Sequence, residues 1–240
     1  MTGSWHNARA MARGLAARPP KLLWVGTAAS LTFAVLAIVA ARRGIFEVDR
    51  STQSFVGLTR HTFLQGPMDT ISLLGQTAGL VPIIAIASVF LWRYSRRWAL
   101  GLPVVMAGTW LLQIVGKWAV DRPRPNGAAL GFPSGHTLSV VVLFGILAYV
   151  VWRSPARQRW RCTAAAMCVA TALAVAFSRL YLDMHWLSDV GGGITVGLAY
   201  LTLAIWCVEL VPVRSSIAAT TEQEGAVEAP SVSITRRDAP

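Results

Sequence analysis

The sequence predicts an all-α fold, a polytopic membrane protein built as a bundle of six transmembrane helices. Two observations carry this prediction. Of the 240 residues, 54% are hydrophobic and only 14% are charged, and the mean hydropathy is +0.51, which is too apolar for an ordinary water-soluble domain of this length. The apolar residues also gather in stretches close to the length, about 20 residues, with which a helix crosses the hydrocarbon core of a bilayer.

Six such stretches follow one another along the chain. The expected spans are residues 22–41, 71–92, 98–116, 137–152, 163–177 and 190–211. The fourth and fifth are short for a span, which helix tilt, snorkelling arginines or an interfacial site would explain. Residues 1–21 then form an N-terminal segment and residues 22–211 the six-span domain. Residues 212–240 are polar and rich in Ser, Thr, Ala and Glu, so we expect a disordered tail.

The segment 44–69, between the first two expected spans, mixes apolar residues with charged and polar neighbours. Two interpretations fit this pattern. It forms either an amphipathic helix that lies in the membrane interface or a solvated loop, because its apolar spacing follows a period of 3.6 only loosely.

An even number of spans places both termini on the same side of the membrane, together with the loops after the second and fourth spans. That side holds Arg9, Arg13, Arg18, Lys21, Arg93, Arg96, Arg97, Arg153, Arg157, Arg159, Arg161 and Arg214, with almost no acidic residue near the spans. Because cytoplasmic loops carry an excess of Lys and Arg, we expect both termini in the cytoplasm and the chain in the plasma membrane.

The net charge of +11 does not indicate a nucleic-acid-binding protein, because the arginines lie between long apolar runs and not on one polar face. The three cysteines, Cys162, Cys168 and Cys207, lie in or beside apolar runs, and their spacing predicts neither a disulfide framework nor a metal cluster. We therefore expect small packing residues at these positions, no bound metal and no nucleic-acid partner.

Three charged segments lie at the ends of the last four expected spans: Lys117 to Pro125, Pro133 to His136, and Ser178 to Asp189. The span count places all three on the same face of the membrane, the one opposite the cytoplasm. Ionisable residues at membrane depth are functional by default, so their convergence predicts a site.

The basic residues of these segments suit a phosphate group. Lys117, Arg124 and Arg179 are fixed positive charges, which would stabilise the charge on the equatorial oxygens during phosphoryl transfer. Ser134 and Gly135 precede a helix, so a hydroxyl group and free backbone N–H groups would add donors for an anion.

Two histidines and one carboxylate complete the expected reactive set. His185 and Asp189 are four residues apart at the start of a helix, hence on one face and one turn from each other. An aspartate that holds one ring nitrogen leaves the other free to attack, so His185 would be the nucleophile and Asp189 its orienter. His136, from a different span, would protonate the departing oxygen and later activate water.

Each fragment also has a purely structural interpretation. Arg122 and Arg179, taken singly, would be interfacial anchors near the ends of spans. The pair of His185 and Asp189 could lie on a helix surface, and Pro-Ser-Gly-His could be an N-cap and turn. The convergence of all three segments on one face favours the functional interpretation.

The three segments resemble the signature motifs of the type 2 phosphatidic acid phosphatase (lipid phosphate phosphatase) superfamily, which are Lys-x6-Arg-Pro, Pro-Ser-Gly-His and Ser-Arg-x5-His-x3-Asp. The eleven matching positions are Lys117, Arg124, Pro125, Pro133, Ser134, Gly135, His136, Ser178, Arg179, His185 and Asp189. The six-span plan also looks like that of bacterial members. The resemblance implies a phosphatase without metal or other cofactor, in which His185 forms a phosphohistidine.

The same resemblance implies that Asp189 supports His185, that His136 is the acid and base, and that Lys117, Arg124, Ser134, Gly135 and Arg179 bind the phosphate. The chain departs from many members of the superfamily at two variable positions, where Asp183 replaces a glycine and Leu187 a proline. We expect the Asp183 carboxylate to be solvated, with tuning of substrate choice as the alternative.

The expected substrate is a membrane lipid phosphate or diphosphate in the bilayer. A site that faces away from the cytoplasm suits recycling of a polyprenyl diphosphate carrier; phosphatidic acid and phosphatidylglycerophosphate are the alternatives. Two rivals remain: a vanadium-dependent haloperoxidase, which shares the phosphate-binding constellation but is soluble, and a transporter that holds an anion without cleaving it. Binding alone needs no oriented nucleophile, which disfavours the transporter.

Overall fold

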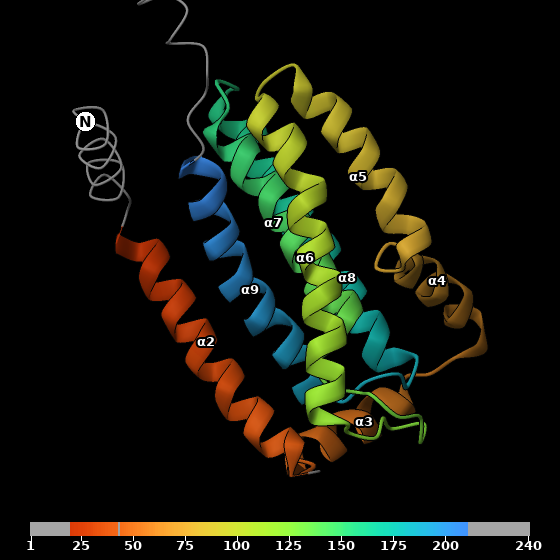
Figure 1. Ribbon diagram of the computed structural model, residues 1–240. Coiled ribbons are helices and arrows are strands. Elements are labelled where there is room, and N and C mark those ends of the chain that lie inside the picture. Colours follow the sequence, from red (N-terminus) through yellow and green to blue (C-terminus); the bar gives the residue numbers. More distant parts are fainter. Residues whose placement is uncertain (1–19, 43, 211–240) are drawn as a thin grey trace, which may run out of the picture. The chain divides into compact units, whose positions relative to one another are not determined.

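The computed structural model describes residues 20–42 and 44–210, which fold into eight α-helices without a strand in these two ranges (Figure 1). The all-α prediction is confirmed. The expected terminal segments 1–21 and 212–240 lie outside the described residues, apart from Pro20 and Lys21 at the start of the first described helix.

The helices are long and mostly antiparallel to their neighbours in sequence (Figure 1). Their bounds are α2 Pro20–Ala41, α3 Glu47–Leu58, α4 Thr62–Leu73, α5 Thr77–Trp92, α6 Arg96–Val120, α7 Gly135–Arg153, α8 Gln158–Tyr181 and α9 Leu187–Leu210. Within the described ranges, five helices are long and apolar enough to cross a membrane, namely α2, α6, α7, α8 and α9, and the bent pair α4 and α5 brings the number to six.

The second expected span, 71–92, is not one continuous helix. Helix α4 ends at Leu73 and α5 begins at Thr77, with a bend of 49° between the two. Gly75 lies in this break, and a Cβ atom there would approach the Cβ of His136 to 2.9 Å. The backbone at the break therefore packs directly against the side chain of His136. The sequence predicts one straight span here and does not show this contact.

Most of segment 44–69 is helical, in α3 and the first part of α4, so the interpretation as a loop is wrong. Helix α3 exposes Phe55 and Leu58, which are 69% and 82% accessible, and buries Asp49 and Val56 on its other side. An apolar exposed surface on a helix with a polar buried group is typical of a helix that lies in a membrane interface.

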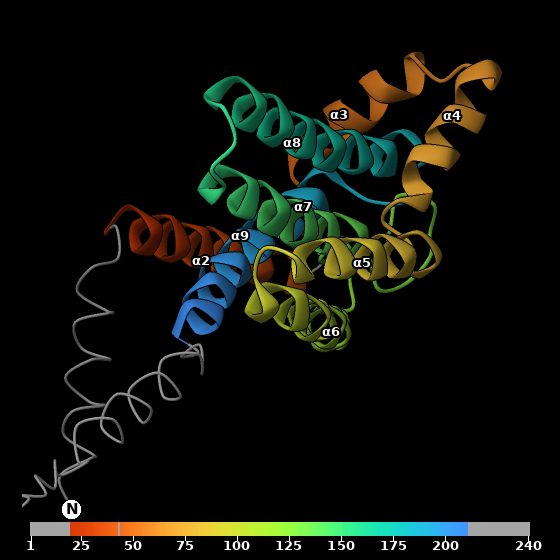
Figure 2. The ribbon, with the colours of Figure 1, turned by 90° about the horizontal axis from the view of Figure 1, so that it is seen from above.

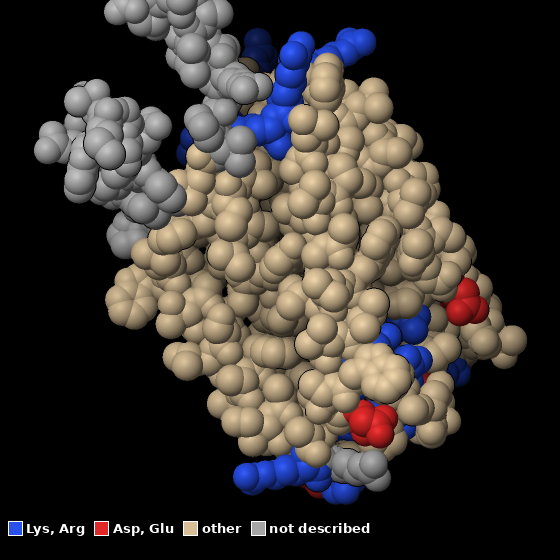
Figure 3. Space-filling view, viewed as in Figure 1, with Lys and Arg blue, Asp and Glu red and all other residues tan. Residues whose placement is uncertain are grey.

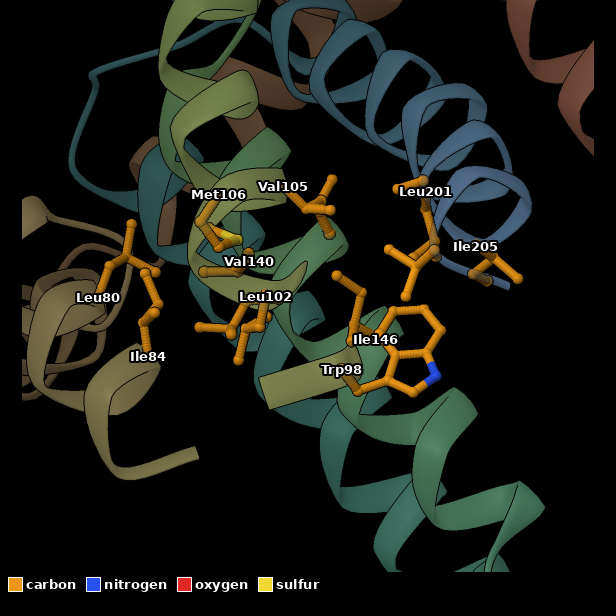
Figure 4. Packing of buried hydrophobic residues seen from close by; sticks show 14 of the residues in the cluster. Leu80, Ile84, Trp98, Leu102, Val105, Met106, Val140, Ile146, Leu201 and Ile205 are labelled. Atoms are coloured by element: carbon orange, nitrogen blue, oxygen red, sulfur yellow. The ribbon is translucent and has the colours of Figure 1, made fainter. Parts of the chain in front are cut away.

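Helix α7 lies at the centre of the bundle and packs against α6, α8 and α9 (Figure 2). Its residues Leu138, Val140 and Ile146 have no accessible surface. They meet Leu102 and Met106 of α6 and residues of α9 in one hydrophobic cluster (Figure 4). This packing fixes the helix that carries His136 at its first turn.

Glycines bring α9 close to α7. A Cβ atom at Gly193 would lie 2.7 Å from the carbonyl oxygen of Ser134 and one at Gly197 would lie 2.9 Å from Cγ1 of Val141. Small residues allow helix backbones to approach closely inside a membrane. The start of α7 and the start of α9 are thereby held together, and the Ser134 amide donates to the Asp189 carbonyl at 3.0 Å.

Charged side chains gather at the two ends of the bundle, with a broad uncharged band between them on the visible face (Figure 3). One end carries the α5–α6 and α7–α8 connections, with Arg93, Arg153 and Arg157 in or beside them. The opposite end carries the α6–α7 and α8–α9 connections. Charges at both ends of an apolar band are the surface of a multi-pass membrane protein.

Candidate active site

The three charged segments meet at one end of the bundle, as the span count predicts. The connection from α6 to α7 and the connection from α8 to α9 are joined directly, because Trp186 Nε1 donates to the Pro123 carbonyl at 3.0 Å. The Ser134 amide bonded to Asp189 joins the second segment to the third. The chain thus brings together residues that are up to 72 positions apart, from Lys117 to Asp189.

His185 lies in the short connection before α9 and is 2% accessible. Its Nδ1 atom is 3.5 Å from Oδ2 of Asp189, one turn along the chain. Burial lowers the pKa of His185, and the charges of Arg179 and Arg124 lower it further, whereas the nearby carboxylate of Asp189 opposes the shift. The imidazole is therefore neutral near pH 7, with Nδ1 turned to the carboxylate and Nε2 on the other side of the ring.

Asp189 is fully buried and uses both carboxylate oxygens. Oδ2 accepts the Trp186 amide at 2.9 Å in addition to facing His185, and Oδ1 accepts from Arg122 at 2.7 Å. These bonds fix the carboxylate in the first turn of α9, where a negative charge interacts favourably with the helix dipole.

His136 stands in the first turn of α7, beside the break between α4 and α5. Its side chain packs against Gly75 in that break, and it lines a polar cavity together with Lys117. Its Nε2 atom is buried and makes no hydrogen bond within the part of the chain that the structure describes. A reacting group is the natural partner for this nitrogen.

The cations come from three elements. Lys117 ends α6, Arg124 lies in the α6–α7 connection and Arg179 ends α8, where it is 5% accessible. The guanidinium of Arg179 donates to the Ser72 hydroxyl of α4, and its Nε has no hydrogen-bond partner among the described residues. A polar cavity of about 350 Å³ lies beside this cluster and is lined by Lys117 and His136.

Ser134 and Gly135 form the start of α7 and are both buried. The Thr137 hydroxyl donates to Oγ of Ser134 at 3.0 Å, which leaves the proton of the Ser134 hydroxyl for another acceptor. A Cβ atom at Gly135 would lie 2.7 Å from Cδ of Gln113, so a side chain there would displace the end of the Gln113 side chain. The first turn of a helix offers unsatisfied N–H groups to an anion at such a place.

Arg122 and Arg179 are not interfacial anchors, and that interpretation is wrong for both. Arg122 has no accessible surface and bonds Oδ1 of Asp189, Oδ2 of Asp49 and the Gly44 carbonyl within 2.9 Å. Sequence reasoning missed Asp49 altogether. Asp49 lies two positions after another acidic residue, Glu47, which is exposed. The sequence pattern does not show which of the two carboxylates is buried.

Asp183 is not a simply solvated carboxylate. Its Oδ1 atom lies 3.0 Å from Arg60 Nη2 and also accepts from Gln53, so the expectation of a solvated group is wrong. Its φ is +61°, in the left-handed region that favours glycine. The backbone at this position therefore explains why a glycine is common there among the proteins that the chain resembles.

The described residues contain no group of three or more His, Cys, Asp or Glu side chains that could hold a metal ion. The cysteines are free; Cys162 and Cys207 are exposed and Cys168 is half-buried. They lie in α8 and α9, outside the cluster of His136 and His185.

Comparison with known proteins adds three findings. Residues 98–211 match the sequence model of the PAP2 superfamily. The chain is 28% identical over 177 residues to phosphatidylglycerophosphatase B of Bacillus subtilis, covering 70% of this chain and 87% of that protein. It is 31% identical over 169 residues to lipid A 1-phosphatase of Porphyromonas gingivalis, covering 65% of this chain and 36% of that protein.

A solved structure gives a further finding. The crystal structure of a transmembrane PAP2-type phosphatidylglycerolphosphate phosphatase from Bacillus subtilis superposes with a TM-score of 0.70 at 25% identity. The match covers 79% of this chain and 98% of the other. The helices that carry the site are thus arranged as in a membrane phosphatase.

Proposed function

Because this chain belongs to the PAP2 superfamily and is a membrane lipid phosphate phosphatase, we propose that it works through a covalent phosphohistidine on His185. The observation that carries the proposal is the orientation of that ring. Nδ1 faces the buried carboxylate of Asp189 at 3.5 Å, which leaves Nε2 for attack on phosphorus.

The first step forms a bond from Nε2 of His185 to phosphorus and breaks the bond from phosphorus to the lipid oxygen. Lys117, Arg124 and Arg179 hold the phosphate and stabilise its equatorial oxygens, together with the Ser134 hydroxyl and the Gly135 amide at the start of α7. Asp189 stabilises the positive charge that the imidazole gains.

His136 serves both steps. In the first, it gives a proton to the departing lipid oxygen. In the second, it takes a proton from the water that attacks phosphorus, and the bond from phosphorus to His185 breaks to release inorganic phosphate. The buried Nε2 atom of His136, which has no hydrogen-bond partner among the described residues, and the cavity that His136 lines with Lys117 support this double role.

Two substrates are the first candidates, one favoured by a relative and the other by the sidedness proposed below. The relative that covers most of this chain is named phosphatidylglycerophosphatase B, which favours phosphatidylglycerophosphate. A site on the outer face favours a polyprenyl diphosphate carrier, whose diphosphate is released on that side. Phosphatidic acid is the third lipid to compare.

We place the site on the non-cytoplasmic face of the plasma membrane and the termini in the cytoplasm. The support is the arginine content of the other end of the bundle, where the α5–α6 and α7–α8 connections and the adjoining helix ends hold Arg93, Arg153, Arg157, Arg159 and Arg161.

Phosphate release tests the proposed function. Detergent-purified protein is given phosphatidylglycerophosphate, a polyprenyl diphosphate and phosphatidic acid with a chelator present, beside the His185→Ala variant. Turnover of at least one lipid by wild type, with loss of turnover in the variant, is expected. Absence of hydrolysis across the three lipids would favour a protein that binds an anion without cleaving it.

Thiol labelling in intact cells tests the sidedness. Cys162 is exposed at the arginine-rich end and provides an internal control in the wild-type chain. Asn126→Cys, in a chain without the three native cysteines, should react with a membrane-impermeant reagent, because Asn126 is exposed at the site end. Cys162 should react only after lysis, and the reverse pattern would invert the topology.

A further inference from the structure

Asp49 is a buried carboxylate of α3, outside the region that matches the PAP2 superfamily. Its side chain has no accessible surface and contacts Ser188 at the start of α9. Oδ1 accepts the Ser188 amide at 2.8 Å and Oδ2 accepts the Ser188 hydroxyl at 2.7 Å. Asp49 therefore caps the N-terminus of α9 from another helix, in the turn that contains Asp189.

Arg122 lies between two carboxylates. Nη1 donates to Oδ1 of Asp189 at 2.7 Å and to the Ser188 hydroxyl, and Nη2 donates to Oδ2 of Asp49 at 2.9 Å. All three ionised side chains have no accessible surface. A buried charge without a partner is strongly unfavourable, so each of these groups depends on the other two.

We propose that Asp49 and Arg122 are positioning residues of the reaction, which hold Asp189 so that its second oxygen faces His185. The proposal rests on the proposed function, because it assigns the support of the nucleophile that the function requires. Neither residue is one of the groups proposed to bind the phosphate. Both act on the reaction through Asp189.

The two carboxylate oxygens of Asp189 have different partners: one is held by Arg122 and the other faces His185. Oδ1 is held by Arg122, and Oδ2 is held by the Trp186 amide and faces Nδ1 of His185. With Oδ1 fixed, the carboxylate cannot rotate without losing a charged hydrogen bond. The outer partners of metal-ligating histidines fix their orientation in this way, and loss of such a partner costs about 10- to 100-fold in activity.

The charges of the group also matter for the reaction. Two carboxylates and one guanidinium leave one net negative charge beside His185, whose ring gains positive charge during attack. The other charged groups that face His185 are Arg179 at the end of α8 and Arg124 in the α6–α7 connection, with His136 of α7 in the same cluster. Asp49 therefore restores a negative charge that Arg122 alone would cancel.

Charge-changing variants that keep the side-chain shape test the proposal. Asp49→Asn makes the surroundings of His185 more positive, so protonated His185 is less favourable. The acidic limb of kcat/KM should move to lower pH by about half a unit or more. Arg122→Gln makes the surroundings more negative and should move the limb to higher pH, and both variants should lose about 10-fold or more in kcat.

Glu47→Gln is the matched control. It removes one negative charge from the same helix, but Glu47 is exposed and pairs with Arg50 of α3. It should keep the wild-type kcat and pH profile. Opposite shifts in the two buried variants, with none in the control, are the expected result; unchanged limbs, or shifts in one direction for both, would overturn the proposal.

The double variant Asp49→Asn with Arg122→Gln decides the case in which a single variant does not fold, because it removes one charge of each sign and keeps the net charge of the buried group at its wild-type value. It keeps one net negative charge on Asp189, so its acidic limb should return to the wild-type position while kcat stays about 10-fold low or lower. Wild-type kcat in the double variant would overturn the proposal. If wild type itself fails to hydrolyse any lipid phosphate, the proposed function fails instead.

Discussion

Oδ2 of Asp189 lies 3.5 Å from Nδ1 of His185, while Oδ1 of the same carboxylate accepts from Arg122 at 2.7 Å. The first distance is longer than a normal hydrogen bond, and the second is short and charged. The carboxylate is thus fixed firmly on its far side and more loosely toward the ring. Asp189 can then tighten on His185 when the ring gains positive charge during attack, as catalytic hydrogen bonds do when substrate binds.

Asp189→Asn tests this relationship. The amide keeps the shape of the side chain but carries no charge, and it presents either an oxygen or an N–H to the ring. We expect kcat to fall about 100-fold or more, with a smaller change in KM, because a carboxylate that orients a histidine acts on the chemical step. Steady-state kinetics with the best lipid substrate measure both constants, and a variant with wild-type kcat would exclude Asp189 as the orienter.

The pH dependence follows from the burial of His185. Burial lowers its pKa below the ordinary value of 6.5, so the ring stays neutral, and able to attack, at and below pH 6.5. Activity should therefore persist as the pH falls through 6.5. It should decrease only when the pH falls below the lowered pKa of His185 in the folded protein. A profile of kcat/KM with its acidic limb above 6.5 would contradict this expectation.

Gly75→Ala tests the break between α4 and α5. The new methyl group would lie 2.9 Å from Cβ and 3.0 Å from Cδ2 of His136, so it must displace the ring or the break. We expect kcat to fall about 10-fold or more, since small misplacements of a reacting group are costly. Gly66→Ala in α4 is the control, because a methyl group there meets nothing within 4 Å, and equal activity in the two variants would separate Gly75 from the site.

Gly193→Ala tests the contact between α7 and α9. Its methyl group would lie 2.7 Å from the Ser134 carbonyl oxygen and 2.9 Å from Cβ of Thr137, both in the first turn of α7. Overpacking of this kind costs about 1–3 kcal/mol, which thermal unfolding in detergent detects as a lower Tm. Gly191→Ala meets only Leu36 at 3.6 Å, an ordinary contact, and should unfold at the wild-type temperature. A Gly193 variant as stable as the Gly191 variant would contradict the close packing.

The spans and the site could be predicted from the sequence because both leave local patterns. Long apolar runs predict helices α6 to α9, and the spacing of Lys117, His136, Arg179 and His185 at their ends predicts one cluster. The break at Gly75 left no such pattern, because a glycine in an apolar run is equally compatible with an unbroken helix.

The role of the segment before α5 could not be predicted for a different reason. Three contacts tie this segment to the site: Asp49 with Arg122, Arg60 with Asp183, and Ser72 with Arg179. Each contact joins residues more than 70 positions apart. Periodicity within a segment says nothing about partners at that distance. For the same reason the sequence around Arg122 is compatible with an interfacial anchor, although Arg122 is one of the most deeply buried residues in the described chain.

Trapping of the covalent intermediate tests the central claim most directly. Wild type, His136→Ala and His185→Ala are mixed with a lipid phosphate that carries ³²P in the cleaved group, quenched in alkaline detergent and digested. The account predicts a label that is stable to alkali and lost in acid, located on the peptide with His185. The label should be stronger in His136→Ala, where hydrolysis of the intermediate is slowed, and absent in His185→Ala. Turnover by wild type without label in any of these proteins, or label on another residue, would contradict it.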